Sequence, residues 1–139
     1  MIEINSHQAL NNPMPDEETR FIAGLIMDLF SVLFETDNFS DQASLFVICN
    51  DKDLQNCEGT WIFEEISSRS FEFVDEITVA DSGNRYFLMC IVPSDSFGAY
   101  VLIKCNNWNL ENLNISRKIV IDRDSTYENF LKSGTPDAT

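Results

Sequence analysis

Residues 86–92 (YFLMCIV) restrict the fold of this chain most strongly, because all seven side chains are apolar or aromatic. Alternate residues of a β-strand point to opposite faces of the sheet, so one alternating set begins at Tyr86 and the other at Phe87. Both sets are apolar, which is typical of a central strand covered on both faces. The turn-like segment 93–98 and a second apolar run at residues 99–105 then predict a β-hairpin.

A second long apolar segment, residues 21–34, predicts a helix. The preceding segment 13–18 (PMPDEE) suits a helix N-terminus, where proline fits and the positive end of the helix dipole favours carboxylates. Apolar residues recur four positions apart from Phe21 to Leu33, so this helix must be largely covered. We interpret it as a core helix packed on a sheet; a helix that binds a partner or drives oligomerisation is the alternative.

The remaining predicted elements are short. Strands are predicted at residues 44–49, 59–63, 71–74 (continuing loosely toward residue 79) and 118–121, with a turn at residues 81–84 and a short helix at residues 125–132. The ends, about residues 1–12 and 133–139, are expected to be loose. We therefore predict one α+β domain over residues 1–139, in which one long N-terminal helix packs on a largely antiparallel sheet of four to six strands, with a short C-terminal helix.

Acidic residues dominate the charge of the chain. Its 139 residues include 23 Asp and Glu against nine Lys and Arg, a net charge of −14. Residues 1–80 hold 16 of the acids and three of the bases, a net charge of −13. Such a field repels nucleic-acid phosphates and anionic lipid, and it accelerates association with a basic partner. We expect a basic protein partner and no direct contact with nucleic acid or membrane; the alternative is that the acids only keep the protein soluble.

Residues that carry most catalytic and metal chemistry are scarce. His7 is the only histidine and falls in the predicted loose arm, so a Ser-His-Asp or Cys-His arrangement is not expected. The four cysteines contain no C-x-x-C pair, and three of them lie in apolar segments. The sequence also has no glycine-rich phosphate-binding motif and no G-x-S-x-G. We predict a protein that is not an enzyme, with no cofactor and no metal.

Segment lengths and cysteine usage bear on the compartment. The longest apolar stretch, residues 21–34, is shorter than the about 20 residues that a membrane span needs. The first residues, MIEIN, lack the basic region and apolar run of a secretory signal. Four cysteines are also too few for a disulfide scaffold. We expect a reduced, cytoplasmic protein, and we favour a monomer.

Six carboxylates gather around the predicted strands at residues 59–63 and 71–74. Strand alternation places Glu64 and Glu65 on opposite sides and turns Glu72 toward solvent. Trp61 is a candidate anchor, since tryptophan is enriched at binding hot spots. A solvated sheet face would produce the same acidic pattern, and no specific spacing supports a carboxylate-dependent hydrolase. The predicted partner-binding residues are Glu58, Trp61, Glu64, Glu65, Glu72, Asp75 and Glu76.

A compact acidic chain of this size, with an α+β pattern and no catalytic residues, resembles the immunity proteins of contact-dependent growth inhibition and related polymorphic toxin systems. The resemblance covers the whole chain in general character, and no family motif is matched residue by residue. It implies a bacterial cytoplasmic inhibitor that binds a cognate toxin domain, often a basic nuclease, and blocks its active site or substrate groove. An acidic secretion chaperone or adaptor for an effector and a phage-type inhibitor that mimics nucleic acid are the alternatives.

Overall fold

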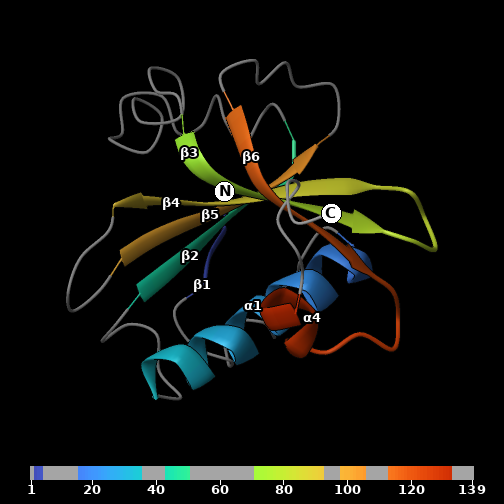
Figure 1. The fold of residues 1–139 in the computed structure, drawn as a ribbon, viewed down its shortest axis with the longest axis horizontal. Helices are drawn as coiled ribbons and strands as arrows, with labels where there is room; N and C mark the ends of the chain where they lie inside the picture. The colour runs from blue at the N-terminus through green and yellow to red at the C-terminus, as the bar shows by residue number, and fades with distance from the viewer. Residues whose placement is uncertain are drawn as a thin grey trace.

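The computed structural model describes residues 2–4, 16–35, 43–50, 71–92, 98–105 and 113–132; the predicted strand at residues 59–63 and the predicted loose end at residues 133–139 lie outside them. This part of the chain forms a six-stranded sheet with two helices against one face (Figure 1). In chain order, the elements are β1 (Ile2–Ile4), α1 (Glu17–Phe34), β2 (Ala43–Ile48), β3 (Phe71–Val79), β4 (Arg85–Val92), β5 (Gly98–Cys105), β6 (Leu113–Ile121) and α4 (Glu128–Lys132).

Helix α1 begins and ends close to the predicted bounds. Its N-cap is Asp16, whose Oδ1 accepts a hydrogen bond from the backbone N–H of Thr19 at 2.6 Å. The helix ends at Glu35, which adopts the left-handed region with φ 53° and donates its backbone N–H to the carbonyl of Ser31. None of the helices in the described part of the chain has the length and apolarity to cross a membrane.

The sheet is mixed rather than largely antiparallel. Its strand order is β1-β2-β5-β4-β3-β6. The β1–β2, β5–β4 and β4–β3 pairs are antiparallel, which confirms the predicted β4–β5 pairing, whereas β2–β5 and β3–β6 are parallel. A local apolar pattern shows where a strand lies but not which distant strand becomes its neighbour. For this reason the two parallel pairs were not expected.

Strand β1 precedes α1, so the long helix is not the first element of the fold. Ile4 of β1 is buried in the core and pairs with Leu45 of β2. Residues 1–12 were predicted to be a short extended or loose arm. Residues 2–4 are extended, and they pair with β2 at the edge of the sheet. The other residues of the predicted arm lie outside the described residues.

Both faces of the sheet are buried. On the side of the helices, Ile22 of α1 shares one core cluster with Tyr86 and Leu88 of β4. On the opposite side, Phe87 and Met89 belong to a second core cluster. The prediction of a central strand with two covered faces is therefore confirmed for β4.

A β-bulge in β6 changes the direction of its side chains. Val74 of β3 pairs with Ile115, but Asp75 pairs with Arg117, so one residue of β6 is extra. Ile115 packs against the second core cluster, whereas Arg117 binds Asp75 and donates a hydrogen bond to the backbone carbonyl of Phe130 in α4. The bulge thus lets an arginine fasten α4 to the sheet.

Candidate functional site

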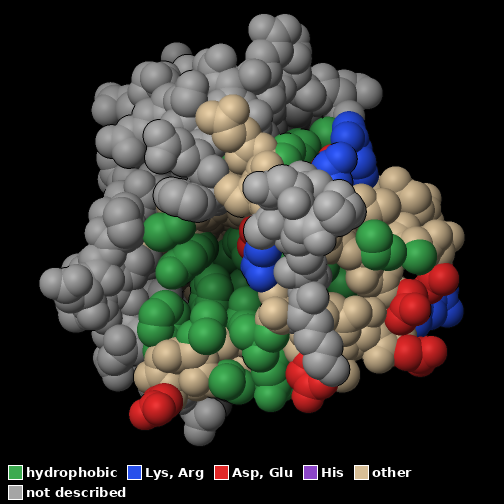
Figure 2. All heavy atoms as spheres, viewed as in Figure 1, with side chains coloured by type: hydrophobic (Ala, Val, Ile, Leu, Met, Phe, Trp, Pro, Cys, Tyr) green, Lys and Arg blue, Asp and Glu red, His purple; other side chains and the backbone are tan. Residues whose placement is uncertain are grey.

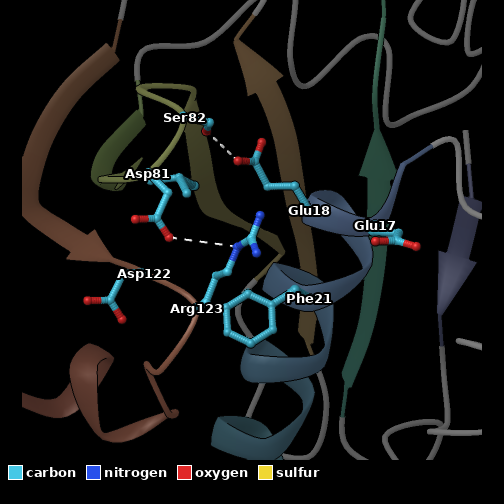
Figure 3. A pocket seen from close by; sticks show the side chains of 8 residues that line it. Glu17, Glu18, Phe21, Asp81, Ser82, Asp122 and Arg123 are labelled. Carbon is cyan, nitrogen blue, oxygen red and sulfur yellow. Dashed lines mark hydrogen bonds and ion pairs between the residues drawn. The ribbon is translucent and has the colours of Figure 1, made fainter.

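A hollow of about 470 Å³ lies at the N-terminal end of α1. Its walls are the first turns of α1, the turn between β3 and β4, and the segment that follows β6 (Figure 3). We call it the α1 hollow. Its lining residues are Glu17, Glu18, Phe21, Val79, Asp81, Ser82, Asp122 and Arg123.

Carboxylates outnumber cations in the α1 hollow. Glu17, Asp81 and Asp122 are exposed, and Glu18 is partly buried. Arg123 is the one cation among these described lining residues; its Nε lies 4.0 Å from Oδ2 of Asp81, and its side chain is 92% exposed. An ion pair this open to solvent contributes little, so the hollow keeps a negative surface.

The carboxylate of Glu18 accepts hydrogen bonds from three side chains of the β3–β4 hairpin. The Asn84 amide and the Tyr86 hydroxyl each donate to Oε2 at 2.8 Å, and the Ser82 hydroxyl donates to Oε1. Burial by itself raises the pKa of Glu18, but these hydrogen bonds and the charge of Lys104 outweigh it and lower the pKa below its usual value of 4.5. Glu18 is therefore ionised at neutral pH.

Tyr86 connects this network to the core. Tyr86 and Thr19 are both fully buried. Because the single hydroxyl proton of Tyr86 goes to Glu18, the Thr19 hydroxyl, 3.2 Å away, donates to the Tyr86 oxygen. Burial raises the pKa of Tyr86 most strongly, the bond from Thr19 lowers it, and Glu18 raises it further, with a net rise. The phenol therefore stays protonated and acts as a donor.

A second carboxylate at the start of α1 is also paired. Oδ2 of Asp16 lies 3.3 Å from Nζ of Lys104 in β5, while Oδ1 caps the helix. Burial raises the pKa of Asp16, but the hydrogen bonds from Thr19 and the charge of Lys104 outweigh it and lower the pKa below the usual 3.8. Asp16 thus fastens the helix to the sheet rather than adding a free charge to the hollow.

The turn between β3 and β4 presents its polar side chains to α1. Gly83 has φ 73° and donates its N–H to the carbonyl of Val79 at 2.6 Å, and the N–H of Val79 bonds the carbonyl of Asn84 at 2.9 Å. Glycine adopts a positive φ without the steric cost of a side chain. Ala80 also donates to the carbonyl of Ile121 at 2.8 Å, which ties the turn to the end of β6. The predicted turn at residues 81–84 is confirmed.

The α1 hollow and the hydrogen-bond network behind it contain several carboxylates and one buried tyrosine hydroxyl. The described residues include no histidine and no group of three side chains arranged to hold a metal ion. The buried Tyr86 hydroxyl is a protonated donor, and the Glu18 carboxylate accepts from it. Ionised carboxylates in a concave surface attract cationic groups, and a guanidinium or ammonium group can form charge-assisted hydrogen bonds with them.

The described members of the predicted partner-binding set do not gather into one surface. Asp75 and Glu76 are consecutive on β3, so their side chains project to opposite faces. Oδ2 of Asp75 lies 2.8 Å from Nη2 of Arg117, and Oε1 of Glu76 lies 2.9 Å from Nη1 of Arg85, so each charge is paired. Glu72 also lies in β3. The other four residues, Glu58, Trp61, Glu64 and Glu65, lie outside the described residues.

Sequence reasoning did not identify the α1 hollow. Glu17 and Glu18 are explained by the preference for acids in the first turn of a helix, and Asp81 is explained by its preference for turns. These local roles gave no reason to group the three residues. The hollow exists because β3 pairs in parallel with β6, which brings the ends of the two strands, and hence Asp81 and Asp122, together. The available signal was that acids recur at the helix start, in the turn and after the last strand.

The acids of the α1 hollow lie on three different elements of the fold. They are held by a capped helix, a glycine turn and a parallel strand pair, so their relative positions are set by the fold. A comparison with known protein families, characterised proteins and solved structures found no match to this chain.

Proposed function

We propose that this chain is a non-enzymatic immunity protein that binds a cognate basic toxin domain, of the nuclease type, and neutralises it by covering its active site or substrate groove. The proposal is carried by the exposed carboxylates grouped around the α1 hollow, Glu17, Asp81 and Asp122. Three separate segments supply these acids. Total charge alone would not require such a grouping.

Charge complementarity supports this role. A nuclease binds phosphates through Lys and Arg, and a rigid set of carboxylates can occupy the positions of those phosphates. Figure 2 shows several acidic side chains, with basic ones beside them, at the right edge of the molecule, and other acidic side chains at the lower border of a broad apolar area. The net charge of −14 would accelerate encounter with a basic domain, and the acids of the hollow would set the docking orientation.

The compartment and the assembly follow from the same proposal. A toxin that cleaves nucleic acid must be neutralised where its substrate lies, so we place the protein in the bacterial cytoplasm. We propose that it acts as a monomer that binds one toxin domain. In this proposal, binding and neutralisation of the toxin domain require neither a cofactor nor a metal.

One observation favours a second candidate, an acidic secretion chaperone that holds an effector segment. Val32 and Leu33 at the end of α1 are 47% and 56% exposed, and Leu131 of α4 is 52% exposed. Exposed apolar side chains can bind an unfolded segment. This candidate predicts binding that depends on these leucines and valine and that persists at high salt.

The proposal is tested by capture followed by inhibition. The full chain is used to recover binding proteins from the source cell at low and high salt, and the recovered protein is assayed for nuclease activity. We expect one basic protein, released by salt, whose nuclease activity falls to zero at one equivalent of this chain. Recovery of a partly unfolded protein that salt does not release, or a nuclease that stays active at saturation, would contradict the proposal.

A further inference from the structure

The first turn of α1 and the β3–β4 turn are two walls of the α1 hollow, and one side chain joins them. We propose that Glu18 is a latch: its carboxylate holds these two walls in one closed arrangement, and loss of its negative charge lets the β3–β4 turn move away from α1. This inference concerns a conformational device in the chain itself. It goes beyond the proposed function and does not depend on it.

The geometry of the latch is a single acceptor shared by three donors. Ser82 and Asn84 come from the turn itself, and Tyr86 comes from the first residues of β4. The hydrogen bonds that the side chains of Ser82 and Asn84 donate to α1 both end on the Glu18 carboxylate. Figure 3 shows the side chains of Ser82 and Glu18 pointing toward each other, joined by this hydrogen bond.

Charge is essential to this arrangement. Hydrogen bonds to an ionised carboxylate are roughly twice as strong as bonds between neutral groups. A neutral carboxylic acid or amide at the same place would carry its own donor, which would face the donors of the hairpin instead of accepting from them. Conversion of Glu18 to its neutral form therefore weakens several bonds at once.

The groups around Glu18 determine how it responds to pH. The positive charge of Lys104 in β5 acts on Glu18 from the sheet. The pKa of Glu18 is lowered in the folded protein. Asp16 of α1, whose own pKa is lowered, contacts the same lysine. The other charged groups that line the hollow are Glu17 of α1, Asp81 of the β3–β4 turn, and Asp122 and Arg123 after β6.

The sign of the pH effect follows from the lowered pKa. The bonds to Glu18 stabilise the closed arrangement fully above its usual pKa of 4.5, and this stabilisation is lost as the pH falls through the lower pKa of the folded protein. Between pH 7 and pH 5 the latch stays closed. As the pH falls through the lowered pKa of Glu18, the latch opens because the carboxylate takes up a proton.

The test is residue-resolved amide hydrogen exchange on the full chain, expressed as protection factors at pH 7 and over a series of acidic pH values that begins below the usual Glu18 pKa of 4.5. Glu18→Gln is compared with Glu17→Gln, a matched change in the same helical turn at an exposed side chain. We expect Glu18→Gln to lower protection of the Ser82 and Gly83 amides by about tenfold or more at pH 7, with Glu17→Gln unchanged. In the unmodified chain, acidification should produce the same loss at these amides.

A second variant keeps the test decisive if Glu18→Gln fails to fold. Asn84→Ala removes one donor from the turn and leaves the core intact, so a smaller loss of protection in the same amides is expected. Equal protection in Glu18→Gln, Glu17→Gln and Asn84→Ala, or a loss spread evenly over all strands, would overturn the latch. Toxin binding is not the readout, so this result is independent of the proposed function.

Discussion

At the scale of single residues, Tyr86 shows how a polar group is accommodated in the core. Its ring lies among the buried apolar side chains beneath α1, and its hydroxyl both donates to Glu18 and accepts from Thr19. The sequence correctly predicts that Tyr86 is buried, because residues 86–92 are apolar on both faces of a strand. It cannot predict the partners of the hydroxyl, since these come from a helix more than 60 residues earlier.

Replacing Tyr86 with Phe tests this network. We expect Tyr86→Phe to lower the free energy of unfolding by about 1–2 kcal/mol, because it leaves the buried Thr19 hydroxyl without its acceptor and removes one donor from Glu18. Urea denaturation at pH 7 measures the change. Tyr100→Phe is the control, since Tyr100 is partly buried, packs its ring 4.4 Å from that of Phe30, and bonds Cys90 outside the network of Glu18 and Thr19. A larger loss in the control would contradict this account of Tyr86.

The two consecutive acids of β3 give a second comparison. Asp75 binds both Nε and Nη2 of Arg117, at 3.0 and 2.8 Å, and Arg117 also fastens α4. Glu76 has one bond to Arg85, whose side chain is 53% exposed. We expect Asp75→Asn to cost about 1–3 kcal/mol of stability, and Glu76→Gln less than about 1 kcal/mol. Thermal unfolding of both variants measures the two losses of stability. Equal losses would contradict the account in which Arg117, placed by the bulge in β6 and held by Asp75, docks α4.

At the scale of elements, α1 illustrates which boundaries a sequence reveals. Its start is marked by prolines and acids, whose preference for a helix N-terminus has a local electrostatic cause. Its end has no glycine or proline; Glu35 takes the left-handed conformation that glycine normally supplies. Strands β2 to β6 were predicted for the same local reasons, whereas β1 was not. The two parallel pairings depend on contacts between distant segments, which local patterns do not encode.

One substitution at the end of α1 is therefore expected to increase the stability of the protein. A left-handed conformation costs a residue with a side chain about 1–2 kcal/mol, and the extra flexibility of unfolded glycine offsets about 0.5–1 kcal/mol of any gain. We expect Glu35→Gly to raise the free energy of unfolding by about 0.5 kcal/mol, measured by urea denaturation. Glu17→Gly, in the first turn of the same helix, should lower stability. A loss of stability in Glu35→Gly would mean that the helix does not end as described.

At the scale of the whole molecule, the acids that line the α1 hollow come from both parts of the chain. Residues 1–80 carry nearly all of the net charge, and we expected the acidic surface to lie there. The α1 hollow instead combines Glu17 and Glu18 from that part with Asp81 and Asp122 from the rest of the chain. The α+β class was predictable from the order of apolar segments. The acidic site was not, because it depends on the β3–β6 pairing.

The association rate constant of this chain with the proposed basic partner tests the central claim most directly. The double variant Glu17→Lys/Asp81→Lys reverses two charges of the hollow, and Glu3→Lys/Glu35→Lys makes the same total change at exposed positions elsewhere. We predict that, at low salt, stopped-flow mixing gives at least about tenfold slower association for the first variant than for the second, and that the difference shrinks as salt increases. Equal rates for the two variants would contradict the assignment of the α1 hollow as the surface that binds the partner.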